Sequence, residues 1–169
     1  LDLLARPDAV YVIDALTLTE FVNLGVQEVL GHLPKVLVST VTKVMLEGLL
    51  REAEEDRSLG TSTEVNGELA FIEHHARYHV RRMEFFKGLL GAVEQYCEVQ
   101  PAYGELPNEG EVPSLADVLQ EEEMEVLMLA KEAGATVLTL DGRFRFVLEV
   151  VAKVPGVCPQ ALLMHCASN

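Results

Sequence analysis

Short, continuous apolar runs alternate along this chain with longer segments in which apolar residues recur every three or four positions. The continuous runs are typical of strands buried on both faces, and they fall at residues 9–13, 35–39, 135–140 and 161–165. A further short strand is expected at residues 94–99, before Pro101. The periodic segments predict amphipathic helices, one beginning near Thr17 or Thr19 and others covering residues 40–56, 68–93, 115–132 and 144–153. Strands that alternate with helices indicate parallel β-α-β units, so we expect an α/β sandwich.

Two polar stretches interrupt this pattern. Residues 58–66 are polar and broken by glycine, and residues 104–113 hold two prolines, two glycines and three glutamates, so both are expected to be loops. A chain of 169 residues has the size of one domain. We therefore expect a single domain over residues 1–169, cut from a longer protein, in which residues 57–113 form a variable, insertion-like region with a long helix and an exposed loop.

Composition narrows the class of protein. No apolar run reaches the roughly 18 residues that a membrane span needs. Three cysteines without a C-x-x-C spacing fit neither a disulfide framework nor a zinc site, which favours a cytoplasmic protein. The net charge of −14 argues against tight, nonspecific binding of nucleic acid, because that affinity comes largely from Lys and Arg contacts to phosphates.

Acidic residues directly follow two of the expected strands. Asp14 ends the run Val-Tyr-Val-Ile-Asp, and Asp141 ends the run Ala-Thr-Val-Leu-Thr-Leu-Asp. Two of the glutamates between them are further candidates, Glu47 in the helix after the second strand and Glu123 18 residues before Asp141. Right-handed β-α-β units bring the carboxyl ends of strands and the amino ends of helices to one edge of the sheet. These four carboxylates are therefore expected to converge.

Carboxylates gathered at one edge repel each other unless a cation neutralises them. Mg²⁺ and Mn²⁺ suit such a cluster, because these hard ions prefer oxygen ligands. A bound ion of this kind acidifies water and stabilises the charge of an in-line phosphoryl displacement. The acidic residues therefore predict hydrolysis of a phosphodiester with the help of a metal ion.

The sequence resembles the PIN-domain (PilT N-terminus-like) nucleases over nearly its whole length, except residues 57–113. The matching stretches are Val-Ile-Asp14, Ser39-Thr40 with the following helix that carries Glu47, and the segment from Glu123 to Asp141. The last stretch is the most specific, because its acidic residue, helix, glycine, apolar strand and Thr-x-Asp come in the order and spacing of the family.

The resemblance implies a three-layer α/β/α sandwich with a central, mostly parallel sheet. It also implies an endoribonuclease that depends on Mg²⁺ or Mn²⁺ and acts on RNA, which we expect to be single-stranded. By position, the catalytic and metal-binding acids are Asp14, Glu47, Glu123 and Asp141. The other domains of the parent chain are expected partners, and PIN-like domains often form homodimers.

Residues near these acids are open to more than one interpretation. Thr139 and Ser39 are either ordinary strand residues or supporting groups that orient the acids or a metal-bound water. Asp117 is a rival ligand, but it lies six residues further from Asp141 than the family pattern requires. Glu123 is therefore preferred, and Glu125 is a candidate for an additional or supporting ligand.

Basic residues are candidates for contacts with the substrate. Arg143 and Arg145 follow the second strand-end aspartate, where they either touch a phosphate or pair with the abundant glutamates. Arg81 and Arg82 lie in the long helix, which is interpreted first as a solvated face and second as a surface for RNA or a partner protein. These four arginines are the predicted substrate-binding residues.

The sequence leaves two alternatives to the nuclease, of which the second is the weaker. The chain can be a PIN-like interaction module with weak or no catalysis, a hypothesis that the net charge supports. A phosphatase on a doubly wound sheet needs Asp-x-Asp after the first strand, whereas Asp14 is followed by Ala15 and Leu16. His75 and His79 have a zinc-competent spacing, but no H-E-x-x-H arrangement or nearby cysteine accompanies them.

Overall fold

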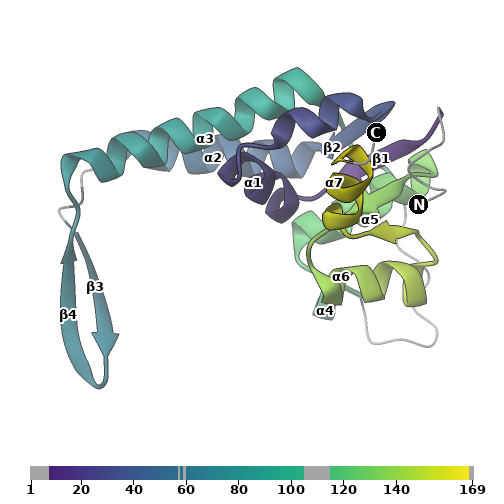
Figure 1. Cartoon of the computed structure of the whole chain (residues 1–169). Helices are drawn as coiled ribbons and strands as arrows, with labels where there is room; N and C mark the ends of the chain where they lie inside the picture. The colour runs from purple at the N-terminus through teal and green to yellow at the C-terminus, as the bar shows by residue number, and fades with distance from the viewer. Residues whose placement is uncertain (1–7, 57, 59, 105–114, 168–169) are drawn as a thin grey trace.

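The computed structural model describes residues 8–56, 58, 60–104 and 115–167, without the side chains of residues 76, 116, 117 and 165–167. Its centre is a five-stranded sheet in the order β5-β2-β1-β6-β7, in which every neighbouring pair is parallel (Figure 1). The strands are β1 (Val10–Ile13), β2 (Lys35–Ser39), β5 (Glu98–Gln100), β6 (Thr136–Leu138) and β7 (Gly156–Val157).

Helices connect these strands and cover both faces of the sheet (Figure 1). They are α1 (Ala15–Asn23), α2 (Thr40–Glu55), α3 (Ala76–Tyr96), α4 (Leu115–Val118), α5 (Glu121–Ala133), α6 (Gly142–Phe146) and α7 (Pro159–Ala167). A short, tight helix at Gln27–His32 follows α1, and a wider helical turn at Val147–Ala152 continues α6. No helix in the described part of the chain is long and apolar enough to cross a membrane.

The central strand β1 sends alternate side chains into two separate apolar cores. Tyr11 and Ile13 pack on one face, in the core that includes Leu89 of α3. Val12 packs on the other face, in the core that includes Phe144 of α6, and all of these side chains are at most 1% exposed. A parallel sheet between two helical layers confirms the expected α/β/α sandwich.

The register of β1 with its neighbours sets the edge at which functional groups gather. Tyr11 lies opposite Val36 of β2 and opposite Thr136 of β6. Because these three strands run in the same direction, their carboxyl ends lie side by side. Asp14 follows the end of β1, and Ser39 is the last residue of β2.

The prediction was wrong for residues 58–73, where the structure contains a β-hairpin in place of a loop and the start of a helix. Strand β3 (Gly60–Val65) pairs in antiparallel fashion with β4 (Glu68–Glu73). The turn between them is Asn66-Gly67, and both residues have positive φ, 54° and 83°. Such a two-residue turn fits the right-handed twist of paired strands, and Asn-Gly is its preferred sequence.

Other predicted boundaries also change. The long helix α3 continues to Tyr96, so the third predicted strand is confined to β5. The expected strand at 161–165 is instead part of helix α7, which begins at Pro159, a residue suited to the first position of a helix. The expected helix at 115–132 is divided into α4 and α5. Most of the loop expected at 104–113 lies outside the described residues.

Helices α2 and α3 pack side by side and lead away from the sheet to the hairpin (Figure 1). Two ion pairs join them in antiparallel order, Lys87 with Glu54 at 3.7 Å and Arg82 with Asp56 at 2.9 Å. Because α2 begins at the carboxyl end of β2, this helical pair starts at the edge where Asp14 lies and carries the hairpin at its far end.

Gly134 ends helix α5 in the left-handed conformation, with φ of 59°. We expect Gly134→Ala to lower the free energy of unfolding by about 1 kcal/mol, because a Cβ is unfavourable in that conformation. Gly91→Ala, in the interior of α3 with open space around its Cβ position, should raise it by roughly 0.5–1 kcal/mol. Urea unfolding of both variants tests this, and equal shifts of the same sign would contradict it.

Candidate active site

Side chains at three strand ends cap the helices that follow. Asp14 accepts a hydrogen bond from the Thr17 amide at 2.7 Å, and Ser39 accepts one from the Thr42 amide at 3.0 Å. Asp141 accepts hydrogen bonds from the amides of Arg143 and Phe144, at 2.7 and 3.1 Å. These caps satisfy amides that the helices leave without partners. They also direct the positive ends of α1, α2 and α6 toward one edge of the sheet.

Two buried threonines connect Asp14 to the segment that carries Asp141. The hydroxyls of Thr139 and Thr17 both hydrogen-bond to the Asp14 carboxylate. The same hydroxyl of Thr139 accepts from the Asp141 amide at 3.0 Å, and that of Thr17 accepts from the Leu140 amide at 3.0 Å. The side chain of Asp14 is thereby held in a fixed position relative to the backbone at Asp141.

Helix α5 brings further carboxylates to this edge. Glu122 Oε1 accepts hydrogen bonds from the Ala15 amide at 2.9 Å and from the Thr42 hydroxyl at 2.7 Å. Glu125 Oε2 accepts from the Val41 amide at 2.7 Å. The amino end of α5 is therefore bonded to the first turns of both α1 and α2.

Burial makes two of these carboxylates costly to ionise. Desolvation raises the pKa of Asp14, and the nearby charge of Asp141 raises it further, against the lowering effect of the Thr139 and Thr17 hydrogen bonds. Desolvation likewise raises the pKa of Glu122, with added repulsion from Asp14. Neither carboxylate forms an ion pair with a Lys or Arg side chain in the described part of the protein. A positive charge at this edge would relieve both.

The guanidinium of Arg143 is the basic group at the rim of the cluster. Its Nη2 lies 2.6 Å from Glu123 Oε1 and 3.6 Å from Asp141 Oδ2. The pKa of Arg143 is raised mainly by the hydrogen bond to the Glu123 carboxylate and then by the charge of that carboxylate. Glu123 also accepts a hydrogen bond from the Gln120 amide at 2.8 Å, which completes a capping box at the start of α5.

The structure brings together some of the predicted residues and separates others. Asp14, Asp141, Thr139 and Ser39 lie at the shared edge, and Glu125 and Glu123 reach it from α5. Glu47, in contrast, pairs with Lys43 one turn earlier on α2, and its side chain is 42% exposed. The side chain of Asp117 lies outside the described residues.

The predicted arginines are distributed over two regions. Arg143 lies at the edge, whereas the side chain of Arg145 lies close to Gly156 of β7. Arg81 and Arg82 are on α3 beside the hairpin, where Arg82 pairs with Asp56. The two pairs of arginines therefore do not form one surface.

Sequence reasoning missed Glu122, Thr42 and Thr17. The spacing to Asp141 selects Glu123 from the run Glu121–Glu123, and it gives no sign that Glu122 makes the contacts with α1 and α2. Helical periodicity does not decide between neighbours here, because the buried residues Val126 and Leu127 lie four positions beyond Glu122 and Glu123 respectively. The hydrogen bond from the hydroxyl of Thr42 depends on tertiary contact between α2 and α5.

The oxygen donors at this edge are of the kind that a hard divalent cation binds. Asp14, Glu122 and Asp141 supply them, and desolvation, with a smaller contribution from neighbouring carboxylates, raises the pKa of the first two. In the side-chain arrangement shown, no three His, Cys, Asp or Glu residues of the described part are placed to hold an ion together. The donor chemistry fits a divalent cation, and binding would require these side chains to move toward one another.

Comparisons with known proteins give a family and a fold. A family model described as the PIN domain associated with the TPR-GreAB-C-PIN system matches residues 12–147. No curated protein matches the chain. Among solved structures, the crystal structure of PAE2754 from Pyrobaculum aerophilum is similar with a TM-score of 0.53 and 15% sequence identity. That alignment covers 95% of this chain and 97% of the other, and at this identity it shows the fold alone.

The raised pKa of Glu122 has a consequence for stability. A carboxyl that binds its proton more tightly when folded makes the free energy of unfolding fall as pH rises from about 4, where the unfolded chain titrates, through its folded pKa. Glu122→Gln retains an oxygen that can accept both hydrogen bonds. Its stability relative to the original chain should therefore rise between pH 4 and pH 7 in the presence of EDTA.

Urea unfolding at several pH values measures this difference. Glu121→Gln, on the exposed neighbouring residue, is the matched control and should leave the pH dependence unchanged. A stability difference for Glu122→Gln that shrinks or stays constant as pH rises would contradict the assignment of Glu122 as a desolvated acid.

Proposed function

The chain belongs to the PIN-domain family, and on that premise we propose that it is an endoribonuclease that depends on Mg²⁺ or Mn²⁺. PIN domains are generally nucleases, which supports phosphodiester hydrolysis as the reaction. The observation that carries the proposal is the buried carboxylate of Asp14 beside the partly buried carboxylate of Glu122, with no basic side chain paired to either in the described residues. A carboxylate pair of this kind is unfavourable in a protein without a cationic ligand.

Asp14 and Asp141, from adjacent strands, are the central ligands in this proposal, and Glu122 completes the set from α5. A divalent cation bound there would acidify a water molecule and stabilise the charge that develops on the phosphate. Thr17 and Thr139 hold the Asp14 carboxylate in one orientation through their hydroxyls. The roles of Glu123 and Glu47 as ligands stay predictions, and a pair of variants compares Glu47 directly with Glu122.

Arg143 is proposed to contact the RNA phosphate. Its guanidinium is half-exposed and lies beside Glu123 and Asp141, at the rim of the cluster. A planar guanidinium binds phosphate oxygens through two parallel hydrogen bonds. Arrival of a phosphate would exchange the Arg143–Glu123 pair for an Arg143–phosphate pair and leave Glu123 free at the same edge.

One observation favours a second candidate function, a PIN-like module that binds a partner without cleaving RNA. Arg143 already supplies a positive charge beside two of the acids, and this partly replaces what a cation would do. The description of the matching family supports a partner that carries TPR or GreAB-C domains.

Cys97 and Cys158 are free thiols, from which we infer a reducing, cytoplasmic setting.

Substitution of the strand-end acids separates the two functions. We expect Asp14→Asn and Asp141→Asn to reduce Mn²⁺-dependent cleavage of single-stranded RNA by at least about a hundredfold, because each removes a charged ligand oxygen. Asparagine retains the helix cap, so circular dichroism and thermal unfolding should show an intact fold. Undiminished cleavage in both variants would contradict the proposal.

A matched pair of glutamate variants tests which helical glutamate, Glu122 or Glu47, binds the metal ion. Glu122→Gln should lose cleavage and should also reduce the rise in Tm that millimolar Mn²⁺ gives the original chain, since a ligand stabilises the state that binds it. Glu47→Gln should leave both quantities unchanged if its exposed pair with Lys43 describes its role. The reverse result would restore Glu47 as the ligand and exclude Glu122. Absence of any Tm rise with Mn²⁺ would favour the binding module.

A further inference from the structure

The hairpin β3–β4 is a separate two-stranded element that exposes large apolar side chains, and such an element needs a partner that covers them. Val65, Leu69, Phe71 and Ile72 are 52%, 87%, 62% and 56% exposed. In the antiparallel register Leu69 and Phe71 lie on one face, whereas Val65 and Ile72 lie on the other. A two-stranded hairpin is at best marginally stable in water, so this one needs further contacts.

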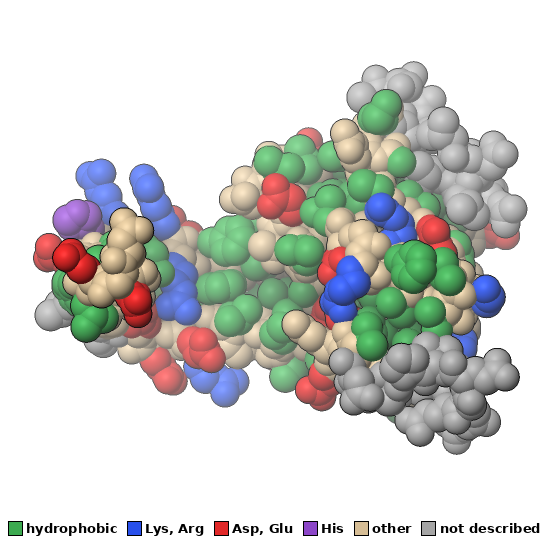
Figure 2. Space-filling view, turned by 90° about the horizontal axis from the view of Figure 1, so that it is seen from below, with side chains coloured by type: hydrophobic (Ala, Val, Ile, Leu, Met, Phe, Trp, Pro, Cys, Tyr) green, Lys and Arg blue, Asp and Glu red, His purple; other side chains and the backbone are tan. Residues whose placement is uncertain are grey.

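Charges are segregated at this end of the molecule. The hairpin carries Glu64, Glu68 and Glu73 and no Lys or Arg. The first turns of α3, directly after it, carry Arg77 and Arg81, and neither takes part in an ion pair with a described residue. Figure 2 shows acidic, basic and apolar side chains gathered together at the hairpin end. An acidic, apolar element therefore stands beside a basic one.

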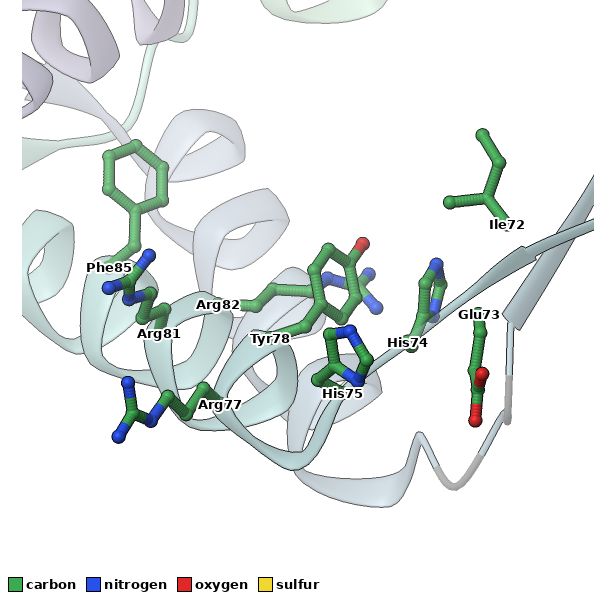
Figure 3. A pocket seen from close by; sticks show the side chains of 9 residues that line it. All are labelled: Ile72, Glu73, His74, His75, Arg77, Tyr78, Arg81, Arg82 and Phe85. Carbon is green, nitrogen blue, oxygen red and sulfur yellow. The ribbon is translucent and has the colours of Figure 1, made fainter.

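A cavity of about 890 Å³ lies in the angle between the hairpin and α3 (Figure 3). Its lining includes Ile72 of the hairpin and Tyr78, Arg81 and Phe85 of α3. Tyr78 and Val80 are both exposed and lie one helical turn from Arg81 and Arg77 respectively, so they add apolar surface next to the two arginines. The cavity therefore offers apolar and basic groups to one ligand, and these complement the apolar and acidic groups of the hairpin.

Polar contacts hold the root of the hairpin at a defined angle to α3. Thr61 hydrogen-bonds to His74 at 2.9 Å, and the His79 ring hydrogen-bonds to the Ser58 carbonyl at 3.1 Å. Arg82 pairs with Asp56 at the end of α2. The hairpin thus projects from the end of α3 like the end of a hook (Figure 1).

We propose that two copies of this chain form a dimer through their β3–β4 hairpins. The hairpin of each copy enters the cavity of the other with the face that carries Glu64, Leu69 and Phe71, so that Glu64 meets Arg77 and Arg81 and the exposed apolar side chains pack together. The contact is self-complementary, as a two-fold symmetric dimer requires. RNA fits this surface less well, because the hairpin carboxylates repel phosphates beside the arginines that attract them.

Charge reversal on each half of the contact tests this dimer, with its dissociation measured by analytical ultracentrifugation in buffer with EDTA. The hairpin variant Glu64→Lys and the helix variant Arg77→Glu/Arg81→Glu should each weaken the dimer at least roughly tenfold, since like charges then face each other. An equimolar mixture of the two variants should regain the dimer, because the introduced lysine then meets an acidic helix and the unchanged Glu64 of the other copy meets a basic one. Lys131→Glu, on α5, is the charge control and should leave the dimer intact.

The proposal is overturned if the original chain is a monomer throughout the micromolar range, if the variants dimerise as tightly as it does, or if their mixture stays monomeric. The surface would instead be assigned to RNA if the original chain is monomeric and the hairpin and helix variants lose affinity for single-stranded RNA. Cleavage assays on the same variants keep this test separate from the proposed nuclease activity, which depends on Asp14 and Asp141.

Discussion

A carboxylate held away from water at the end of the central strand imposes the main constraint on this protein. Asp14 is 4% exposed, and desolvation opposes its ionisation. The groups around it compensate in part: two threonine hydroxyls, the amide of Thr17 and the positive end of α1. Glu122 then adds a second, partly buried acid, which is hydrogen-bonded to the first turns of α1 and α2. This local excess of negative charge connects the fold to the proposed binding of a divalent cation.

The same edge is the starting point of the second feature, the hairpin arm. Helix α2 begins at the capped end of β2, and its antiparallel partner α3 extends beyond it to the hairpin. Ion pairs along the two helices, and hydrogen bonds at the root of the hairpin, maintain this geometry. A dimer clasped through the arms would therefore place two copies of the acidic edge in a fixed relation to each other. Cleavage chemistry and assembly would then depend on separate residues joined by one pair of helices.

Local sequence signals predicted those parts of the fold that local forces determine. The apolar runs located β1 and β2 nearly to the residue, and the aspartates that follow β1 and β6 lie together because parallel strands in register end at one level. The hairpin also had a local signal, the Asn66-Gly67 turn. The helical pattern of the basic segment that follows nevertheless predicts a helix from residue 68, which includes the second strand of the hairpin. The choice between Glu122 and Glu123 had none, since neighbours on a helix differ by about 100° and only packing fixes which one faces α1 and α2.

The central claim is that Asp14, Glu122 and Asp141 together bind a divalent cation, and a crystal structure with Mn²⁺ tests it most directly. The anomalous scattering of manganese locates the ion independently of any assumption about its ligands. The account predicts one strong anomalous peak at the carboxyl edge of the sheet, within coordination distance of oxygens from Asp14 and Asp141 and with Glu122 in reach. A fully ordered edge with no peak at millimolar Mn²⁺, or a peak beside Glu47 instead, would contradict it.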